Sequence, residues 1–239
     1  MENNKETVVI TGATRGIGLA LAEAYNQKGY QVYALDIKQH NNLSPDIIFK
    51  QIDLRHPESI DKIFTEIKSE SGVINILINN AAIAYFNKDI RETSFEDYER
   101  LMSVNLKATF FCCKAFIKLH DISQYGRIIN IASTRWAQNE PDWELYGASK
   151  GGVVSLTSSL AISTANQNMT VNAISPGWIV CDKYEQISSK EHSFHPSGRV
   201  GRPQDIVKAA FYLSDKDNDF VNGINLVVDG GVTKKMIYD

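Results

Sequence analysis

TVVITGATRGIG, residues 7–18, runs from an apolar, strand-like segment through a glycine-rich turn into a helical pattern. Gly12, Gly16 and Gly18 give the spacing G-x-x-x-G-x-G. Glycines permit a tight turn and a close approach of the backbone to a ligand, and the N-terminus of the following helix offers free N–H groups to a pyrophosphate. Between a first strand and a first helix, this turn predicts a dinucleotide-binding site.

The remaining chain alternates apolar, strand-like segments with longer segments of helical period. The predicted strands, most of them apolar on both faces, are 7–12, 31–36, 47–53, 74–80, 126–133, 169–177 and 222–231. The predicted helices are 16–28, 57–71, 94–120, 146–166 and 203–214, the last with Pro203 in its first turn. This alternation predicts an α/β protein: one domain over residues 1–239, with a doubly wound parallel sheet (a Rossmann fold) of about seven strands and helices on both faces.

Segment 178–202, WIVCDKYEQISSKEHSFHPSGRVGR, interrupts the alternation because it is long, polar and weakly periodic. Loops of this length in compact domains are functional lids or poorly ordered segments. The segment follows the carboxyl end of a predicted strand, which is where open α/β sheets bind ligands. We therefore expect a substrate lid here.

Charge and composition exclude several partners. The 25 basic and 28 acidic side chains give a net charge of -3, without a long basic run, so neither nucleic acid nor a membrane surface is expected as a partner. No apolar stretch approaches the ~20 residues that cross a bilayer, and the start lacks a secretory leader. Three cysteines without framework spacing indicate reduced thiols, and no cluster suggests a metal site. The expected location is the cytoplasm.

Asp36 ends the second predicted strand, 18 residues beyond Gly18. A carboxylate at this position accepts hydrogen bonds from the adenosine ribose hydroxyls and repels a 2′-phosphate. Arg15 could pair with that phosphate instead, but Ile37 offers no second cation. A carboxylate fixed at the ribose should outweigh one flexible arginine, so the sequence favours NAD over NADP.

Asp53 ends the third predicted strand in the same way and could contact the adenine amino group. An equally open alternative is that Asp53 caps the turn that follows it, DLRHPES.

Tyr146 and Lys150 lie four residues apart in YGASK, residues 146–150. On a helix, positions i and i+4 share one face. For an isolated pair, the simpler explanation is a surface helix that carries both side chains by chance. Other motifs in the chain must show whether the pair is functional instead.

Several motifs in their order along the chain resemble the short-chain dehydrogenase/reductase family, over nearly the whole length. They are TGATRGIG (11–18), NNAA (79–82), Asn105 in LMSVNLKATF, Ser133 in IINIAS, Tyr146 and Lys150 in YGASK, PGW (176–178) and VVDGG (227–231). Ser133 and Tyr146 are 13 residues apart, as is typical of that family. This agreement in order and spacing makes a chance match of Tyr146 and Lys150 negligible.

The resemblance implies an oxidoreductase that transfers a hydride between a nicotinamide cofactor and a secondary alcohol or ketone. Tyr146 would be the acid/base, and Lys150 with the oxidised nicotinamide would lower the pKa of the phenol. Ser133 would bind the substrate oxygen. Asn105 would hold a water that links Lys150 to solvent, or its side chain would satisfy a kink in the helix; the two roles are compatible.

The resemblance also implies a set of cofactor-binding residues. They are Gly12, Thr14, Arg15, Gly16, Ile17, Gly18, Asp36, Asp53, Leu54, Asn80, Ala81, Tyr146, Lys150, Pro176, Gly177 and Ile179. Two positions depart from the family pattern: Ala82 replaces a glycine, and Cys181 replaces a threonine that bonds the cofactor in many relatives. A thiol is a weak donor, so these departures bear on cofactor affinity.

The substrate should meet the residues just after Ser133, just before Tyr146 and at the start of the lid. These candidates are Ser133, Arg135, Trp136, Trp143, Tyr146 and Trp178. One cation and several aromatic surfaces indicate a polar substrate, anionic or polyhydroxylated. For Arg135, a solvated loop charge or a subunit contact is an equally good explanation. His192 and His195 in the lid are expected to be surface residues rather than catalysts.

Two other functions compete with a dehydrogenase. A non-catalytic dinucleotide-binding sensor or scaffold could share the fold, although it has no need of Ser133, Tyr146 and Lys150 together. An epimerase or dehydratase shares Tyr-x-x-x-Lys but usually has another glycine spacing and a larger C-terminal region. By family analogy the partners are a small-molecule substrate and further copies of the chain, as a tetramer or a dimer.

Overall fold

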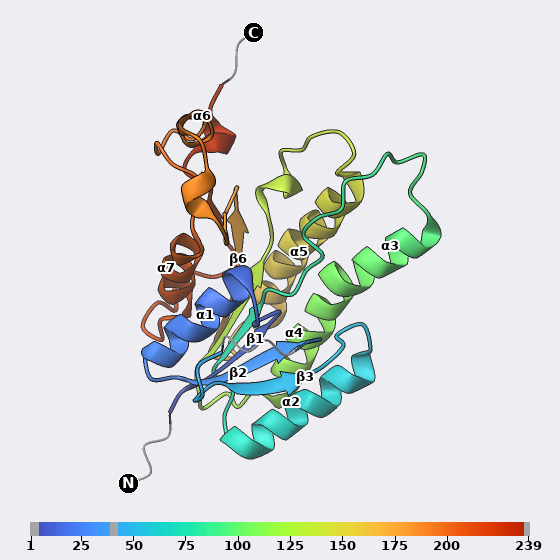
Figure 1. The fold of residues 1–239 in the computed structure, drawn as a ribbon. Helices are drawn as coiled ribbons and strands as arrows, with labels where there is room; N and C mark the ends of the chain where they lie inside the picture. Colours follow the sequence, from blue (N-terminus) through green and yellow to red (C-terminus); the bar gives the residue numbers. More distant parts are fainter. Residues whose placement is uncertain (1–4, 39–42, 237–239) are drawn as a thin grey trace.

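The computed structural model describes residues 5–38 and 43–236, and one parallel sheet of seven strands runs through its centre (Figure 1). The strands are β1 Thr7–Thr11, β2 Gln31–Asp36, β3 Ile48–Gln51, β4 Ile76–Asn79, β5 Gly126–Ile131, β6 Met169–Pro176 and β7 Asn225–Val228. Their order is β3-β2-β1-β4-β5-β6-β7, with parallel pairing throughout. The predicted doubly wound Rossmann sheet is confirmed.

The burial of the strands explains their composition. Every residue of β1, β4, β5 and β6 is buried, because helices cover both faces of the central sheet. The edge strand β7 is half-buried throughout, and β3 is half-buried or exposed. Both edge strands are shorter than predicted, at Ile48–Gln51 and Asn225–Val228.

Helices cover both sides of the sheet (Figure 1). The helices are α1 Gly16–Gln27, α2 Pro57–Ser71, α3 Phe95–Met102, α4 Ala108–Leu119, α5 Glu144–Ser163, α6 Ser189–Ser193 and α7 Pro203–Ser214. The short helix α6 lies apart from the helices that cover the sheet, in segment 178–202 (Figure 1). Side chains of α1 and α7 pack in one core with Ile10 and Ile78 of the sheet. Side chains of α2, α4 and α5 pack in a second core with Val9 and Leu77 on the opposite face (Figure 1).

The helix predicted over 94–120 is present from Phe95 to Leu119, but it is not α-helical throughout. A π-helical turn, Ser103–Lys107, separates α3 from α4. π-Helical turns inside α-helices occur frequently at functional sites, and this one contains Asn105.

The strand order reverses direction between β1 and β4, which are neighbours in the sheet. In open α/β sheets, ligands bind beyond the carboxyl ends of the strands at such a point. Gly12, Asn80, Ser133 and Gly177 come just after the carboxyl ends of β1, β4, β5 and β6. The parallel sheet therefore places the predicted site residues at one end of the molecule.

Candidate active site

The glycine turn between β1 and α1 is tightly packed. Gly12 and Gly16 have φ values of +62° and +57°, a region that favours glycine. A Cβ added to Gly18 would lie 2.0 Å from the carbonyl oxygen of Gly12, so α1 rests directly on the turn. The Asn80 Nδ2 donates to the carbonyl oxygens of Thr11 and Gly12, at 3.0 and 2.9 Å.

The same turn fits a pyrophosphate. The N-cap of α1, Arg15, makes no side-chain hydrogen bond to the helix, and of the first N–H groups that of Ile17 bonds the Cys181 side chain. The free N–H groups and the partial positive charge of a helix N-terminus bind phosphate groups. The residues present are thus suited to a dinucleotide.

Thr11 is a residue that the sequence interpretation did not single out. Its Oγ1 accepts hydrogen bonds from the backbone N–H groups of Asn80 and Ala81, each at 3.0 Å. These bonds tie the end of β1 to the chain after β4. The threonine precedes the first glycine of the turn, which is the signal that could have identified it.

Asp36, at the end of β2, is fixed beside the glycine turn. Its Oδ2 accepts hydrogen bonds from the Thr14 N–H at 3.2 Å and the Thr14 Oγ1 at 2.8 Å, and its Oδ1 accepts one from the Ile37 N–H at 2.8 Å. The structure thus brings the predicted ribose-binding carboxylate to the predicted pyrophosphate site.

Asp53 is engaged with Arg55 in the following turn. Its carboxylate accepts hydrogen bonds from the Arg55 backbone N–H at 3.0 Å and from the Arg55 Nη2 at 2.6 Å. The Arg55 side chain is the main reason that the pKa of Asp53 is lowered to about 2. These contacts agree with the alternative that Asp53 caps the turn that follows it. The contact of Asp53 with the adenine amino group stays a prediction. Leu54 beside it is buried.

Tyr146 and Lys150 face the same side of α5, and both are buried. The Lys150 Nζ lies 5.8 Å from the centre of the Tyr146 ring and donates a hydrogen bond to the Ile131 carbonyl oxygen at 2.8 Å. Burial lowers the pKa of Lys150 to about 8. An ammonium group therefore lies inside the protein, held by the end of β5.

The pKa of Tyr146 lies above its ordinary value. Burial is the dominant influence and raises it, while a hydrogen bond with the Ser133 side chain and the positive charge of Arg135 lower it. Lys150 is not among the influences on this pKa, and the expected joint effect of Lys150 and the oxidised nicotinamide stays a prediction. Desolvation of the phenolate outweighs the nearby charges.

Ser133 follows β5 and caps the short 3₁₀ helix Thr134–Trp136. Its Oγ accepts a hydrogen bond from the Arg135 N–H at 3.3 Å. Because Ser133 also bonds the Tyr146 side chain, the loop after β5 and the start of α5 meet at these two hydroxyl groups. The structure thus brings the three predicted catalytic side chains Ser133, Tyr146 and Lys150 together.

Asn105 joins three parts of the site from within its π-helical turn. Its Oδ1 accepts from the Ile83 N–H at 2.8 Å, and its Nδ2 donates to the Ile83 carbonyl oxygen and to the Ser149 Oγ, both at 3.2 Å. Ser149 in turn donates to the Tyr146 carbonyl oxygen at 2.7 Å. The asparagine side chain is thus satisfied by the protein, and its role in holding a water stays a prediction. Ser149 had no sequence signal beyond its place in YGASK.

The substrate candidates next to Tyr146 form a stack. The Arg135 guanidinium lies 3.9 Å from the centre of the Trp143 ring, and Trp143 packs edge-on against Tyr146 with ring centres 5.7 Å apart. Arg135 also pairs with Glu140 of the same loop. Trp136, by contrast, is 42% exposed at the surface.

The lid begins directly after β6. A backbone bridge pairs Ile179 with Gly201, so the two ends of segment 178–202 lie side by side. Gly177 lies close against Asp229, since a Cβ added to Gly177 would lie 2.7 Å from the Asp229 Cβ. The Cys181 sulfur is next to Gly16, at 3.3 Å from an added Cβ there, which places the departure from the family pattern at the glycine turn.

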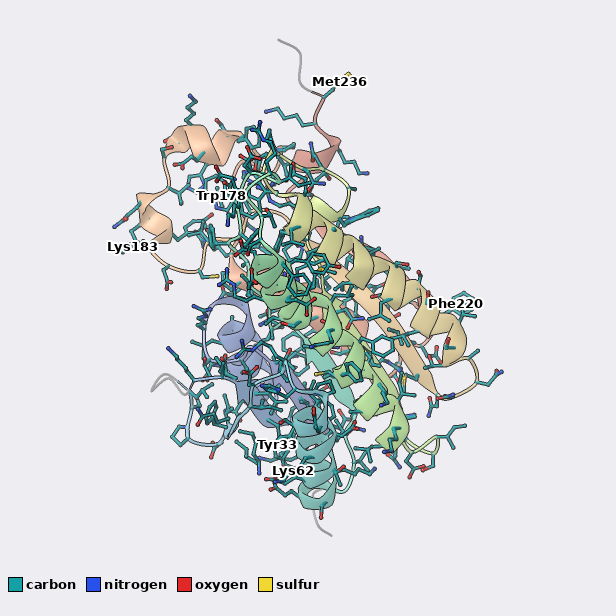
Figure 2. All side chains as sticks on the ribbon, turned by 90° about the vertical axis from the view of Figure 1, so that its right-hand side faces the viewer. Tyr33, Lys62, Trp178, Lys183, Phe220 and Met236 are labelled. Carbon is teal, nitrogen blue, oxygen red and sulfur yellow. The ribbon has the colours of Figure 1, made fainter. Side chains whose placement is uncertain are left out.

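Segment 178–202 is held together by hydrogen bonds between its own residues. The Tyr184 hydroxyl donates to the Val200 carbonyl oxygen at 2.7 Å, and the Val200 N–H donates to the His192 Nδ1 at 3.2 Å. His195 is buried, 6.0 Å from the Trp178 ring. The prediction that both lid histidines are surface residues is therefore wrong for His195. Figure 2 shows Trp178 and Lys183 at one end of the molecule, away from Tyr33 and Lys62.

Two further findings concern residues 5–38 and 43–236. Within this part of the chain, no group of three or more His, Cys, Asp or Glu side chains could hold a metal ion. None of the helices described there combines the length and the apolar character needed to cross a bilayer. All three cysteines are free, with Cys112 and Cys113 buried and Cys181 exposed.

The sequence of this chain is similar to a family model and to known proteins. A family model described as Enoyl-(Acyl carrier protein) reductase matches residues 12–233. An uncharacterized oxidoreductase of Thermotoga maritima is 36% identical, over 98% of this chain and 98% of the relative.

Solved structures agree with this relationship. The ligand-free aldohexose dehydrogenase of Thermoplasma acidophilum superimposes with a TM-score of 0.91 at 27% identity, covering 99% of this chain and 97% of that one. A 4-hydroxyisoleucine dehydrogenase with NADH gives 0.86 at 35% identity, and ElxO with NADP gives 0.87 at 29%; both alignments cover 97% of this chain and all of the other. The chain belongs to the short-chain dehydrogenase/reductase family and is an NAD(P)-dependent oxidoreductase.

Proposed function

We propose that the protein is an NAD-dependent dehydrogenase that interconverts a secondary alcohol and a ketone, with Tyr146 as the acid/base. The observation that carries this proposal is the meeting of the Ser133 and Tyr146 side chains above the buried Lys150 ammonium. A protein that only bound a dinucleotide would have no use for a buried phenol, a serine and a lysine in one place.

The residues that would hold the dinucleotide are the glycine turn with the N-terminus of α1, Asp36, Asn80, Lys150 and the chain from Pro176 to Ile179. When bound, the nicotinamide supplies a hydride acceptor or donor at its C4 atom. Its oxidised ring is also a positive charge, which favours the phenolate.

Tyr146 would move the proton at the substrate oxygen, taking it during alcohol oxidation and giving it back during ketone reduction. Because burial raises the pKa of Tyr146, its hydroxyl is the proton-bearing form near neutral pH and is ready to act as the acid. Ser133 would donate a second hydrogen bond to the same oxygen and so fix its orientation. Lys150 has a pKa of about 8, so its ammonium group gains and loses a proton around pH 8.

NAD is the proposed cofactor because the Asp36 carboxylate is held in place by Thr14 and Ile37. A fixed negative charge at the ribose repels a 2′-phosphate. Arg15 is exposed and makes no capping bond, so it is the weaker of the two opposing influences. One solved relative holds NADH and another holds NADP, so the choice rests on these residues.

A small polar compound is the proposed substrate, in line with the aldohexose and 4-hydroxyisoleucine dehydrogenases among the solved relatives. The chain would act as one domain in the cytoplasm, with segment 178–202 as the substrate lid. It would work as a homo-oligomer, a tetramer or a dimer. Exposed apolar side chains on α4 and α5, such as Phe110 and Ile162, support association.

The experiment is a panel of secondary alcohols with NAD and of ketones with NADH, followed by the absorbance of the reduced nicotinamide. We expect turnover with at least one small polar member of the panel. Measurable NADH binding without turnover on any member would instead support a non-catalytic dinucleotide-binding sensor or scaffold.

A further inference from the structure

Arg135 is a cation held near Tyr146 by the aromatic side chain of Trp143. Its guanidinium lies 3.9 Å from the centre of the Trp143 ring, a distance at which the ring face attracts a cation. Trp143 itself packs edge-on against Tyr146. The position of the cation relative to the phenol is therefore set by two successive contacts, Arg135 on Trp143 and Trp143 on Tyr146.

The loop that carries these residues is seated firmly on α5. A Cβ added to Gly147 would lie 2.7 Å from the Asn139 Oδ1 and 3.0 Å from the Arg135 carbonyl oxygen. Trp143 is the N-cap of α5, and its carbonyl oxygen accepts the first hydrogen bond of that helix, from the Gly147 N–H at 2.8 Å. Close backbone contact at this glycine keeps residues 135–143 next to Tyr146.

The positive charge of Arg135 acts on Tyr146, because it is one of the influences that lower the pKa of this phenol. Arg135 therefore does not behave as a distant, fully solvated loop charge. Its own side chain is only 24% exposed.

The present partner of Arg135 is easily replaced. Glu140 pairs with the guanidinium from five residues along the same loop, and its side chain is 68% exposed. Water reaches the Glu140 carboxylate and competes with Arg135 for its charge, which weakens the pair. A substrate carboxylate can thus take the place of Glu140 at the guanidinium.

We propose that Arg135 selects substrates that bear a carboxylate, so that the physiological substrate is a hydroxy acid and its product an oxo acid. Glu140 occupies the guanidinium until the substrate carboxylate takes its place. Arginine suits this role because its planar fork binds a carboxylate through two parallel hydrogen bonds. This inference rests on the proposed dehydrogenase function and adds the substrate class to it.

The test compares secondary hydroxy acids of increasing length with their primary amides, which have nearly the same shape but no charge. The value of kcat/KM with NAD is measured for each acid and its amide in the wild type, Arg135→Gln and Glu140→Gln. Arg91→Gln is the matched control, because Arg91 forms a similar ion pair with Asp89 in another exposed loop.

We expect the wild type to prefer at least one acid to its amide by about tenfold to a hundredfold, the worth of a charge-assisted hydrogen bond. Arg135→Gln should lower kcat/KM for the acid by about tenfold to a hundredfold more than for its amide, and so abolish this preference. Glu140→Gln should lower the KM of the acid by up to about fivefold, since the competing carboxylate is gone. Arg91→Gln should change none of these values.

An equal loss for acid and amide in Arg135→Gln would overturn the proposal and give Arg135 a structural role through Trp143. A wild type that oxidises neutral alcohols without any preference for acids would overturn it too, while the dehydrogenase function would stand. Absence of turnover on every acid and every neutral alcohol, with NADH still bound, would instead refute the dehydrogenase function and this inference with it.

Discussion

Gly18 is the position where one added methyl group should disturb the cofactor turn most. In Gly18→Ala the new Cβ would lie 2.0 Å from the Gly12 carbonyl oxygen and 2.5 Å from the Asn80 Nδ2. Ordinary contacts between such atoms are about 3.5 Å, so either α1 or the turn must move. The movement would break the hydrogen bond from Asn80 to Gly12, which is 2.9 Å long.

The expected cost has two parts. Overpacking a tight site costs about 1–3 kcal/mol, and the loss of one hydrogen bond costs about 1 kcal/mol. We therefore expect the free energy of unfolding to fall by about 2–4 kcal/mol. A displaced helix N-terminus should also weaken NADH binding by at least about tenfold.

Gly151→Ala is the matched control, because Gly151 lies within α5 and an added Cβ there meets nothing within 4 Å. In a helix interior, alanine is favoured over glycine by about 0.5–1 kcal/mol, so this variant should be slightly more stable than the wild type. Urea unfolding measures the stability, and the fluorescence of bound NADH measures the affinity. If Gly18→Ala kept both wild-type values, the packed glycine turn would not be the cofactor site.

Three further predictions concern the cofactor, the buried lysine and the asparagine. Asp36→Ala should lower the ratio of kcat/KM for NAD to that for NADP by at least about tenfold, and an unchanged ratio would remove Asp36 from cofactor selection. Burial lowers the pKa of Lys150 from 10.5 to about 8. Between pH 8 and 10.5 the lysine is therefore protonated more often in the unfolded chain than in the folded protein. The contribution of Lys150 to the free energy of unfolding consequently rises with pH over this range. The free energy of unfolding of the wild type minus that of Lys150→Met, from urea titrations, should therefore increase between pH 8 and 10; a constant difference would contradict the buried ammonium. Asn105→Ala leaves the Ile83 N–H and carbonyl oxygen without their partner and should cost about 2–4 kcal/mol in urea unfolding, whereas wild-type stability would refute this bracing role.

Local spacing was enough to predict much of the fold and part of the site. The alternation of apolar strands and helical segments predicted the doubly wound sheet, because parallel strands covered on both faces must be apolar on both faces. The glycine spacing and the four-residue step from Tyr146 to Lys150 are features of single elements, and the sequence could therefore identify them.

Features that depend on tertiary packing could not be predicted. The π-helical turn at Ser103–Lys107 leaves no mark in a pattern of apolar residues that continues through it. The direction of the Tyr146 pKa depends on burial, and the burial of His195 depends on how the lid folds on Trp178. The pairing of Arg135 with Glu140 and Trp143 depends on the path of one loop, which spacing alone does not fix.

The central claim is that the Tyr146 hydroxyl carries the proton in the reaction, and Tyr146→Phe tests it most directly. Turnover and NADH affinity are measured together on the substrate that the wild type accepts, with Tyr98→Phe at a partly exposed position as the control. The account predicts that Tyr146→Phe binds NADH as the wild type does and loses at least about a hundredfold in kcat, the typical contribution of a general acid/base. Turnover in Tyr146→Phe close to that of the wild type would contradict it.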